Sequence, residues 1–320
     1  MLQKRPMSFV GYQDVNLHCP VCGAGNQELT LCGGGSYLSV PRRLRVYSQN
    51  GQNVIMESTL LHCSACSLQY LNPMPPREIL ENHYKNSALL HGTYTLERFL
   101  SAINDVDNKK DVNTVMDWLC TTFQQNRDFF SSGYLMDVGC NAGGFIKAAK
   151  DMGMKCLGIE IDQKLCDWNK TFIGCEVFAG MFEDIPETYN DSASVIVIKD
   201  SLEHHLTPVT TLSIARRLLK EGGVLFVEVP NIGCLLAQHN IEAFGWFEAD
   251  HLVYFSKNSI RTAFEKSKFT NIVVSSAPAS NLDRSDVIVT GLGHVDVSWS
   301  EVEKLIAQEK GRKLWCAGRK

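Results

Sequence analysis

Residues 133–230 alternate between short apolar stretches and segments with a helical pattern. The apolar stretches have the length of buried strands: YLMDVGC, KCLGIEID, EVFAGM, ASVIVIKD and GGVLFVEVPN. This alternation predicts an α/β fold, in which a parallel sheet carries helices on both faces. The helix KNSIRTAFEKSK and the candidate strands NIVVSSA and DVIVTGLG follow, and they would complete the sheet.

The region before the sheet has a different pattern. Residues 1–75 contain many glycines and the strand-like stretches SYLSVPRRLRVY and NVIMESTLLHC, which predict a small β-rich domain. The proline cluster NPMPP ends it, and Pro76 suits the first turn of a helix through REILENHY. We therefore expect a helical connector at 76–130, the α/β domain at 131–298, and a C-terminal helix or tail at 299–320.

One helix within the connector is indicated by spacing alone. Apolar residues of DVNTVMDWLCTTF recur at three- and four-residue steps, which predicts a single buried face formed by Val112, Val115, Met116, Leu119 and Phe123.

The composition of the chain argues against nucleic-acid-binding, membrane and secreted proteins. Of 320 residues, 44% are hydrophobic and 21% charged, and the net charge of −4 argues against a nucleic-acid-binding protein. No apolar run approaches the ~20 residues that span a bilayer, and the first residues lack the apolar core of a secretory signal. We expect a cytoplasmic protein without membrane contact.

Four of the 12 cysteines form two C-x-x-C pairs. In a reducing compartment such pairs hold a metal more often than they form disulfides. They supply the four thiolates of tetrahedral zinc and leave no position for water, which indicates a structural site with ligands Cys19, Cys22, Cys63 and Cys66. Gly23 favours the first knuckle, whereas Ser67 takes that place in the second. A nucleic-acid-binding ribbon is the alternative, supported only by RRLR at 42–45.

The glycine-rich turn MDVGCNAGGF, residues 136–145, decides between two ligand classes. A dinucleotide fingerprint needs a middle glycine, where this chain has Asn141, and Asp137 places a carboxylate where a diphosphate would sit. Both features favour a cationic ligand such as S-adenosylmethionine (SAM) and weaken NAD-linked oxidoreduction. Glu160 ends the next predicted strand, where a carboxylate can bind ribose hydroxyls.

The series D-x-G-x-x-x-G-G, G-I-E-I-D and IKDSLEHH resembles the class I SAM-dependent methyltransferases over residues 130–298. The resemblance implies a Rossmann-like seven-stranded sheet. It places the methionine part at the glycine loop, the ribose at Glu160 and the adenine at Met181. The implied cofactor-binding residues are Asp137, Gly139, Cys140, Asn141, Gly143, Glu160, Ile161, Met181, Phe182, Asp200 and Ser201. The alternative is a tight strand-to-helix turn in an unrelated α/β protein.

The N-terminal CPVCG…HCSACSLQYLNPMPP is similar to methyltransferases with a small zinc-binding N-terminal domain, a group that includes sugar C-methyltransferases. This resemblance implies SAM, a structural zinc ion and a small-molecule methyl acceptor such as a saccharide, nucleotide-sugar or secondary metabolite. The sugar C-methyltransferases usually carry a further C-terminal domain, whereas this sequence has a short tail after residue 298. An oxygen or carbon acceptor is expected, and the sequence does not decide between O-, C- and N-methylation.

Methyl transfer requires alignment and deprotonation of the acceptor, and histidine is the natural base near neutral pH. LEHH at 202–205 and FEADHLVYFS at 247–256 both follow carboxyl ends of predicted strands. The second tract resembles an acceptor-facing stretch of the family. That likeness makes His251 the first candidate base, assisted by Asp250 or Glu248, and His204 the second. His251 could instead be a buried core histidine, and His205 suits a cap or a solvent-facing position.

A second function class stays open. The chain could be a zinc-ribbon interaction module whose α/β domain binds a nucleotide without chemistry. Burial of His204 and His251 in a packed core would favour this reading, whereas their meeting at an open cleft would favour the enzyme.

Overall fold

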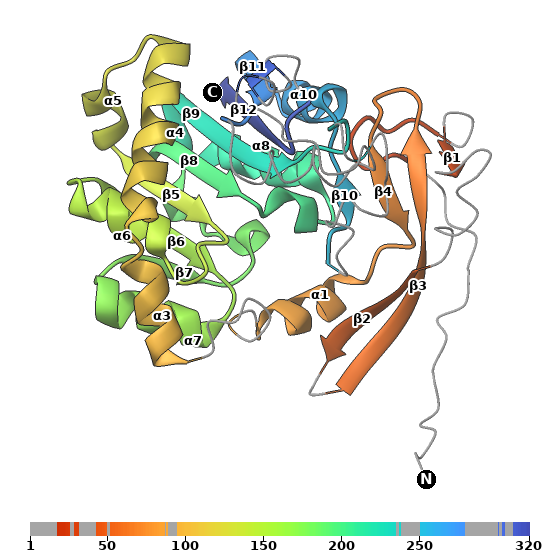
Figure 1. The fold of residues 1–320 in the computed structure, drawn as a ribbon, viewed down its shortest axis with the longest axis horizontal. Coiled ribbons are helices and arrows are strands. Elements are labelled where there is room, and N and C mark those ends of the chain that lie inside the picture. The colour runs from red at the N-terminus through yellow and green to blue at the C-terminus, as the bar shows by residue number, and fades with distance from the viewer. Residues whose placement is uncertain are drawn as a thin grey trace.

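The computed structural model describes residues 18–25, 29–31, 43–49, 52–86, 88, 95–234, 237, 250–278, 300, 303–304 and 310–320. Two β-sheets dominate these residues and lie side by side (Figure 1). None of the described helices is both long enough and apolar enough to cross a bilayer.

The larger sheet has seven strands in the order β11-β12-β9-β8-β5-β6-β7. β12 is antiparallel to both neighbours, and the other pairs are parallel. The strands are β5 (Tyr134–Val138), β6 (Lys155–Glu160), β7 (Glu176–Ala179), β8 (Ala193–Lys199), β9 (Leu219–Pro230), β11 (Thr270–Ser276) and β12 (Lys313–Arg319). The predicted Rossmann-like sheet is confirmed.

Helices cover both faces of this sheet (Figure 1). The α-helices are α1 (Arg77–Tyr84), α3 (Leu96–Ile103), α4 (Asp107–Phe123), α5 (Arg127–Ser131), α6 (Gly144–Asp151), α7 (Gln163–Trp168), α8 (Pro208–Leu218) and α10 (Lys257–Lys266). Shorter turns are the π-helical Asn169–Ile173 and the 3-10 segments Phe182–Asp184, Glu187–Tyr189 and Leu202–His204.

Alternation along the strands divides the apolar core into two layers. Ile196 and Ile198 of β8 belong to one buried cluster, which includes residues of α8 and α10. Val195 and Val197 belong to the other, which includes residues of α3, α4 and α6. Successive strand residues point to opposite faces of the sheet, so alternate residues of one continuous apolar run pack into the two core layers. The predicted buried face of α4 is confirmed, because all five of its residues are buried.

The smaller sheet contains the N-terminal strands and one strand from the far end of the chain. It consists of β1 (Leu29–Leu31), β2 (Arg43–Gln49), β3 (Gln52–Cys63), β4 (Gln69–Asn72) and β10 (Val253–Tyr254). β10 pairs antiparallel with β4, placing Val253 opposite Tyr70. Strands β1–β4 and helix α1, which we call the N-terminal unit, are therefore joined by hydrogen bonds to the segment that follows β9.

Two boundaries differ from the sequence expectations. The C-terminal helix expected within 299–320 is wrong for Lys313–Arg319, which form β12 between β9 and β11. The helical pattern TPVTTLSIARRLLKEGG predicts a helix that stops at Gly222, whereas α8 ends at Leu218 and β9 begins at the next residue. The candidate strand at 286–293 lies outside the described residues. Pairing on both sides of β12 outweighs the local preference that suggested a helix.

Candidate active site

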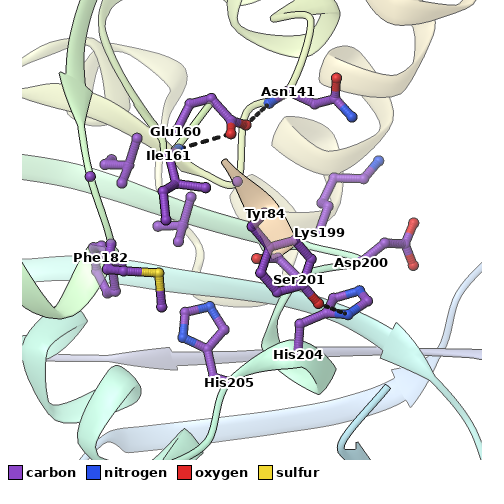
Figure 2. Close-up of a pocket in the computed structure, with 15 residues that line it drawn as sticks. Tyr84, Asn141, Glu160, Ile161, Phe182, Lys199, Asp200, Ser201, His204 and His205 are labelled. Atoms are coloured by element: carbon purple, nitrogen blue, oxygen red, sulfur yellow. Dashed lines mark hydrogen bonds between the residues drawn. The ribbon is translucent and has the colours of Figure 1, made fainter. Parts of the chain in front are cut away.

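A pocket of about 330 Å³ lies at the carboxyl ends of β5, β6 and β8, where open α/β sheets bind ligands. Its volume is within the usual range for small-molecule sites. The lining residues are Tyr84, Val138, Gly139, Asn141, Ile159, Glu160, Ile161, Gly180, Met181, Phe182, Lys199, Asp200, Ser201, His204 and His205. Figure 2 shows Glu160 toward one end and the Tyr84–His204 pair toward the other.

The glycine loop reaches the pocket through residues with unusual backbone angles. Gly139 has a φ of 75°, and a Cβ on it would lie 2.8 Å from the Ser201 hydroxyl oxygen. Asn141 has a φ of 47°, a conformation that asparagine tolerates better than most residues. The loop therefore packs closely against the end of β8, and a larger residue at 139 would disrupt that contact.

Glu160 is held in one orientation by three backbone amides. Its carboxylate accepts hydrogen bonds from the amides of Asn141 (2.9 Å), Ile161 (2.8 Å) and Asp162 (2.9 Å). Burial raises the pKa of Glu160, although these bonds counteract the rise. A buried, oriented acceptor at the end of β6 fits the paired hydroxyls of a ribose. Met181, Phe182 and Ile161 supply an apolar wall beside it.

Three predicted cofactor residues lie outside the pocket lining. Asp137 is buried on β5, and burial raises its pKa to about 7 while Lys199 opposes the rise. Cys140 is buried, and its Sγ would lie 2.8 Å from a Cβ on Gly158. A Cβ on Gly143 would lie 1.9 Å from Asn169 Oδ1, so this glycine serves the packing of the loop. The other predicted cofactor residues line the pocket.

The other end of the pocket contains His204. Its Nδ1 lies 2.9 Å from the Tyr84 hydroxyl and 3.0 Å from the backbone carbonyl oxygen of Asp250 (Figure 2 shows the contact with Tyr84). A carbonyl oxygen can only accept, so Nδ1 carries the hydrogen and the lone pair of the neutral ring falls on Nε2. The Asp250 carboxylate lies 3.6 Å from the same nitrogen.

His251 is placed differently. It is 6% exposed, and its ring centroid lies 4.7 Å from that of His204, behind the pocket lining. The structure thus puts the second candidate base, rather than the first, at the pocket surface. Glu248 lies outside the described residues.

Sequence reasoning missed Lys199, which lines the pocket and forms an ion pair with Asp111 of α4. Its position directly before Asp200 at the end of a predicted strand was an available signal. His205, the C-cap residue of the 3-10 turn Leu202–His204, also lines the pocket, and its Nδ1 lies 2.8 Å from the Glu183 carboxylate.

The four predicted zinc ligands converge away from this pocket. Their sulfur atoms all lie within 4.8 Å of one another, with 3.6 Å between Cys19 and Cys66 and 3.5 Å between Cys22 and Cys63. Sulfurs bound to one tetrahedral zinc at ~2.3 Å would be separated by roughly 3.8 Å. The donor set and its spacing fit a zinc ion.

Both cysteine turns have the same backbone shape. The amide of Gly23 donates to the Cys19 carbonyl (3.0 Å), and the amide of Ser67 donates to the Cys63 carbonyl (2.7 Å). Gly23 and Ser67 both have positive φ angles, 79° and 63°. The serine therefore adopts the knuckle conformation for which glycine is the more obvious residue.

The fold and the pocket together define an α/β protein whose cavity at the ends of β5, β6 and β8 has the size and the buried acid that suit a nucleoside-type ligand. A family model described as a methyltransferase domain matches residues 113–274, half of the chain. The chain belongs to this family and is a class I SAM-dependent methyltransferase.

Solved structures with a similar fold have low sequence identity. A SAM-dependent methyltransferase from Archaeoglobus fulgidus is 14% identical over 63% of this chain and 98% of its own, with a TM-score of 0.45. One from Mesorhizobium loti is 11% identical over 65% and 100%, with a TM-score of 0.44. The CurJ carbon methyltransferase is 14% identical over 72% and 60%, with a TM-score of 0.48. No curated protein sequence is significantly similar to the chain.

The burial of Asp137 predicts a pH-dependent stability difference. Its pKa is about 7 in the folded chain against an ordinary value of 3.8, so the native state keeps a proton that the unfolded state loses as pH rises between these values. Native stability therefore falls with rising pH in that window. The variant Asp137→Asn should gain stability relative to wild type from about pH 4 to about pH 7, measured by urea unfolding followed by circular dichroism.

Asp151→Asn is the matched control, because Asp151 lies on the surface of α6. Its stability relative to wild type should change far less across the same range. A constant difference for Asp137→Asn would contradict the raised pKa.

Proposed function

We propose that the chain transfers the methyl group of SAM to an oxygen or carbon of a small molecule, such as a saccharide, nucleotide-sugar or secondary metabolite. The observation that supports this most directly is that one cavity has Glu160 at one end and the Tyr84–His204 pair at the other. A donor whose ribose lies at Glu160 leaves the histidine end for the acceptor. In-line displacement at the methyl carbon needs this opposed arrangement.

In this proposal the acceptor loses its proton at the histidine cluster. His204 is the member that meets the acceptor, and His251 lies behind it at a centroid distance of 4.7 Å. The Nδ1 contact with the Asp250 carbonyl sets the ring orientation and directs the basic Nε2 away from that carbonyl. A histidine general base contributes roughly a hundredfold or more to such a step.

The non-catalytic interaction module is not favoured. That reading required both histidines to be buried in packed core, whereas His204 lines the same pocket as Glu160. The match to a methyltransferase domain also supports chemistry at this pocket.

We further propose a structural zinc ion at Cys19, Cys22, Cys63 and Cys66, held reduced as in the cytoplasm. The four sulfurs form a closed donor set within 4.8 Å of one another. Because no ligand position is left for substrate, the ion would stabilise the N-terminal sheet rather than act in catalysis.

Replacing Glu160 should weaken cofactor binding. Glu160→Gln removes the charge that accepts hydrogen bonds from ribose hydroxyls, and bonds to a charged group contribute about 1.5–3 kcal/mol each. We expect SAM affinity to fall at least tenfold in a calorimetric titration. The exposed Glu187 provides the control, and Glu187→Gln should bind SAM as wild type does. Unchanged affinity in Glu160→Gln would place the ribose elsewhere.

Replacing His204 should separate catalysis from cofactor binding. His204→Gln should keep SAM affinity, because Glu160 lies at the other end of the pocket. It should lower turnover roughly a hundredfold or more. The measurement is release of S-adenosylhomocysteine with an acceptor found by screening small hydroxylated molecules against wild-type enzyme. Turnover that survives in His204→Gln but not in His251→Asn would return the role to His251.

Zinc content should follow the cysteine cluster. Cys66→Ser should remove one zinc equivalent per chain, measured by elemental analysis of the purified protein, and should lower the unfolding midpoint. Cys120 lies on α4 outside the cluster, so Cys120→Ser should retain wild-type zinc. Equal zinc in both variants would refute the assignment.

A further inference from the structure

A second group of side chains with metal-ligand chemistry lies next to the pocket. Glu203, His204 and His251 each offer one ligand atom, and the three atoms lie within 4.8 Å of one another. Glu203 and His204 belong to the 3-10 turn after β8, whereas His251 precedes β10. The fold thus brings together two segments that are 46 positions apart in the sequence.

The Glu203 carboxyl group points to an additional ligand. Glu203 is 1% exposed, and within the described part of the chain neither of its side-chain oxygens has a hydrogen-bond partner. No hydrogen bond joins this carboxyl group to either imidazole, although their ligand atoms are close. Burying a carboxyl group without a partner is unfavourable in either protonation state. A cation among the three groups would satisfy it.

The surrounding contacts hold these groups in place. The Leu252 amide donates to the Glu203 backbone carbonyl at 2.9 Å, which fixes the two segments to each other. His204 Nδ1 donates to the Asp250 carbonyl at 3.0 Å. Histidines that bind metals usually make such a bond with their other ring nitrogen, because it sets the tautomer and the ring orientation.

We propose that Glu203, His204 and His251 bind a divalent transition-metal ion, and that this ion binds an oxygen of a hydroxylated methyl acceptor. Two imidazoles and one carboxylate suit Mn²⁺, Fe²⁺, Co²⁺ or Zn²⁺, whereas Mg²⁺ is usually bound through oxygen ligands. The three protein ligands leave coordination positions for an acceptor. Because His204 also lines the pocket, an acceptor oxygen could reach the ion from the donor side.

The second half of the proposal rests on the proposed methyl transfer and gives His204 a different part in it: its Nε2 binds the ion and so does not itself take the acceptor's proton. A metal ion lowers the pKa of a bound hydroxyl group, so its proton can leave to solvent before transfer. The oxygen then attacks the methyl carbon of SAM. The C–S bond breaks as the O–C bond forms, and the electron pair stays on sulfur to give neutral S-adenosylhomocysteine. The imidazoles therefore affect the acceptor's proton only by holding the ion that lowers the pKa of the hydroxyl group.

Manganese binding to the full chain tests the site. The protein is first dialysed against a chelator until one zinc per chain remains at the four cysteines, and Mn²⁺ is then added while free Mn²⁺ is followed by electron paramagnetic resonance. Mn²⁺ prefers oxygen and nitrogen ligands to thiolates, so it reports on this site rather than on the cysteines. We expect one bound equivalent in wild type and at least tenfold weaker binding in Glu203→Gln.

Glu187→Gln is the control and should bind Mn²⁺ as wild type does. Circular dichroism and SAM titration check that Glu203→Gln is folded. If the zinc-loaded wild type takes up neither Mn²⁺ nor Co²⁺, the site is refuted. Equal Mn²⁺ affinity in wild type and Glu203→Gln would also refute it.

Methyl transfer distinguishes the two halves of the proposal. We expect S-adenosylhomocysteine release to depend on added Mn²⁺ in wild type and to be lost in Glu203→Gln. Full turnover without the added ion would overturn the role at the acceptor while leaving the proposed function intact. Failure to bind SAM would refute the proposed function, and the manganese result would still decide the metal site.

Discussion

The end of the pocket that contains His204, where we propose the acceptor binds, depends on residues 250–255, which are hydrogen-bonded on both sides. We call it the acceptor end. On one side Val253 pairs with Tyr70 of β4, and the Leu71 amide donates to the Leu252 carbonyl at 2.9 Å. On the other side the Leu252 amide donates to the Glu203 carbonyl. Asp250 and His251 therefore cannot move independently of either sheet. Their contacts with His204 are set by backbone pairing rather than by side-chain packing alone.

The pairing of β4 with β10 also connects the four-cysteine cluster to the segment beside the pocket. Cys63 ends β3, and only a short turn separates Cys66 from β4. β4 in turn pairs with β10. A zinc ion at the cluster would constrain the strand on which the acceptor end is built. The N-terminal unit would then contribute to the enzyme through the geometry of the histidines, although its own metal lies away from the chemistry.

Backbone amides orient a charged side chain of the pocket, Glu160. Three amides donate hydrogen bonds to its carboxylate, and Glu160 lines the pocket. Asp137 was expected at the cofactor because an acid favours a cation over a diphosphate. In the structure Asp137 is buried on β5 and lies outside the pocket lining. Glu160, with its amide contacts, and Asp200 are the two acids of the pocket lining.

The alternation of strands and helices from Tyr134 to Pro230 could be predicted from the sequence, because apolar runs and helical segments alternate there, and the carboxyl ends of parallel strands must meet at one edge. That argument places Glu160 and Ser201 near each other without knowledge of any side-chain contact. β12 escaped it because residues 313–319 become a strand through pairing with β9 and β11, which no local pattern in the tail reveals. The same sequence pattern could not decide whether His204 or His251 lies at the pocket. Both follow strand ends, and their different positions, with His204 in the pocket lining and His251 buried, depend on long-range contacts that the local sequence does not contain.

The two ends of the pocket therefore have different origins in the chain. The end of the pocket near Glu160, where we propose the donor binds, comes from the strands β5 to β8 and the turns that follow them, between Tyr134 and Ser201. The acceptor end combines α1, the turn after β8 and the segment before β10, which are far apart in sequence. Tyr84 of α1 and Asp250 both contact the same nitrogen of His204, so a shift of the N-terminal unit would move the acceptor end and leave Glu160 in place. In the proposed function, the sheet would position the methyl donor, and the docking of the N-terminal unit onto residues 250–255 would shape the acceptor site.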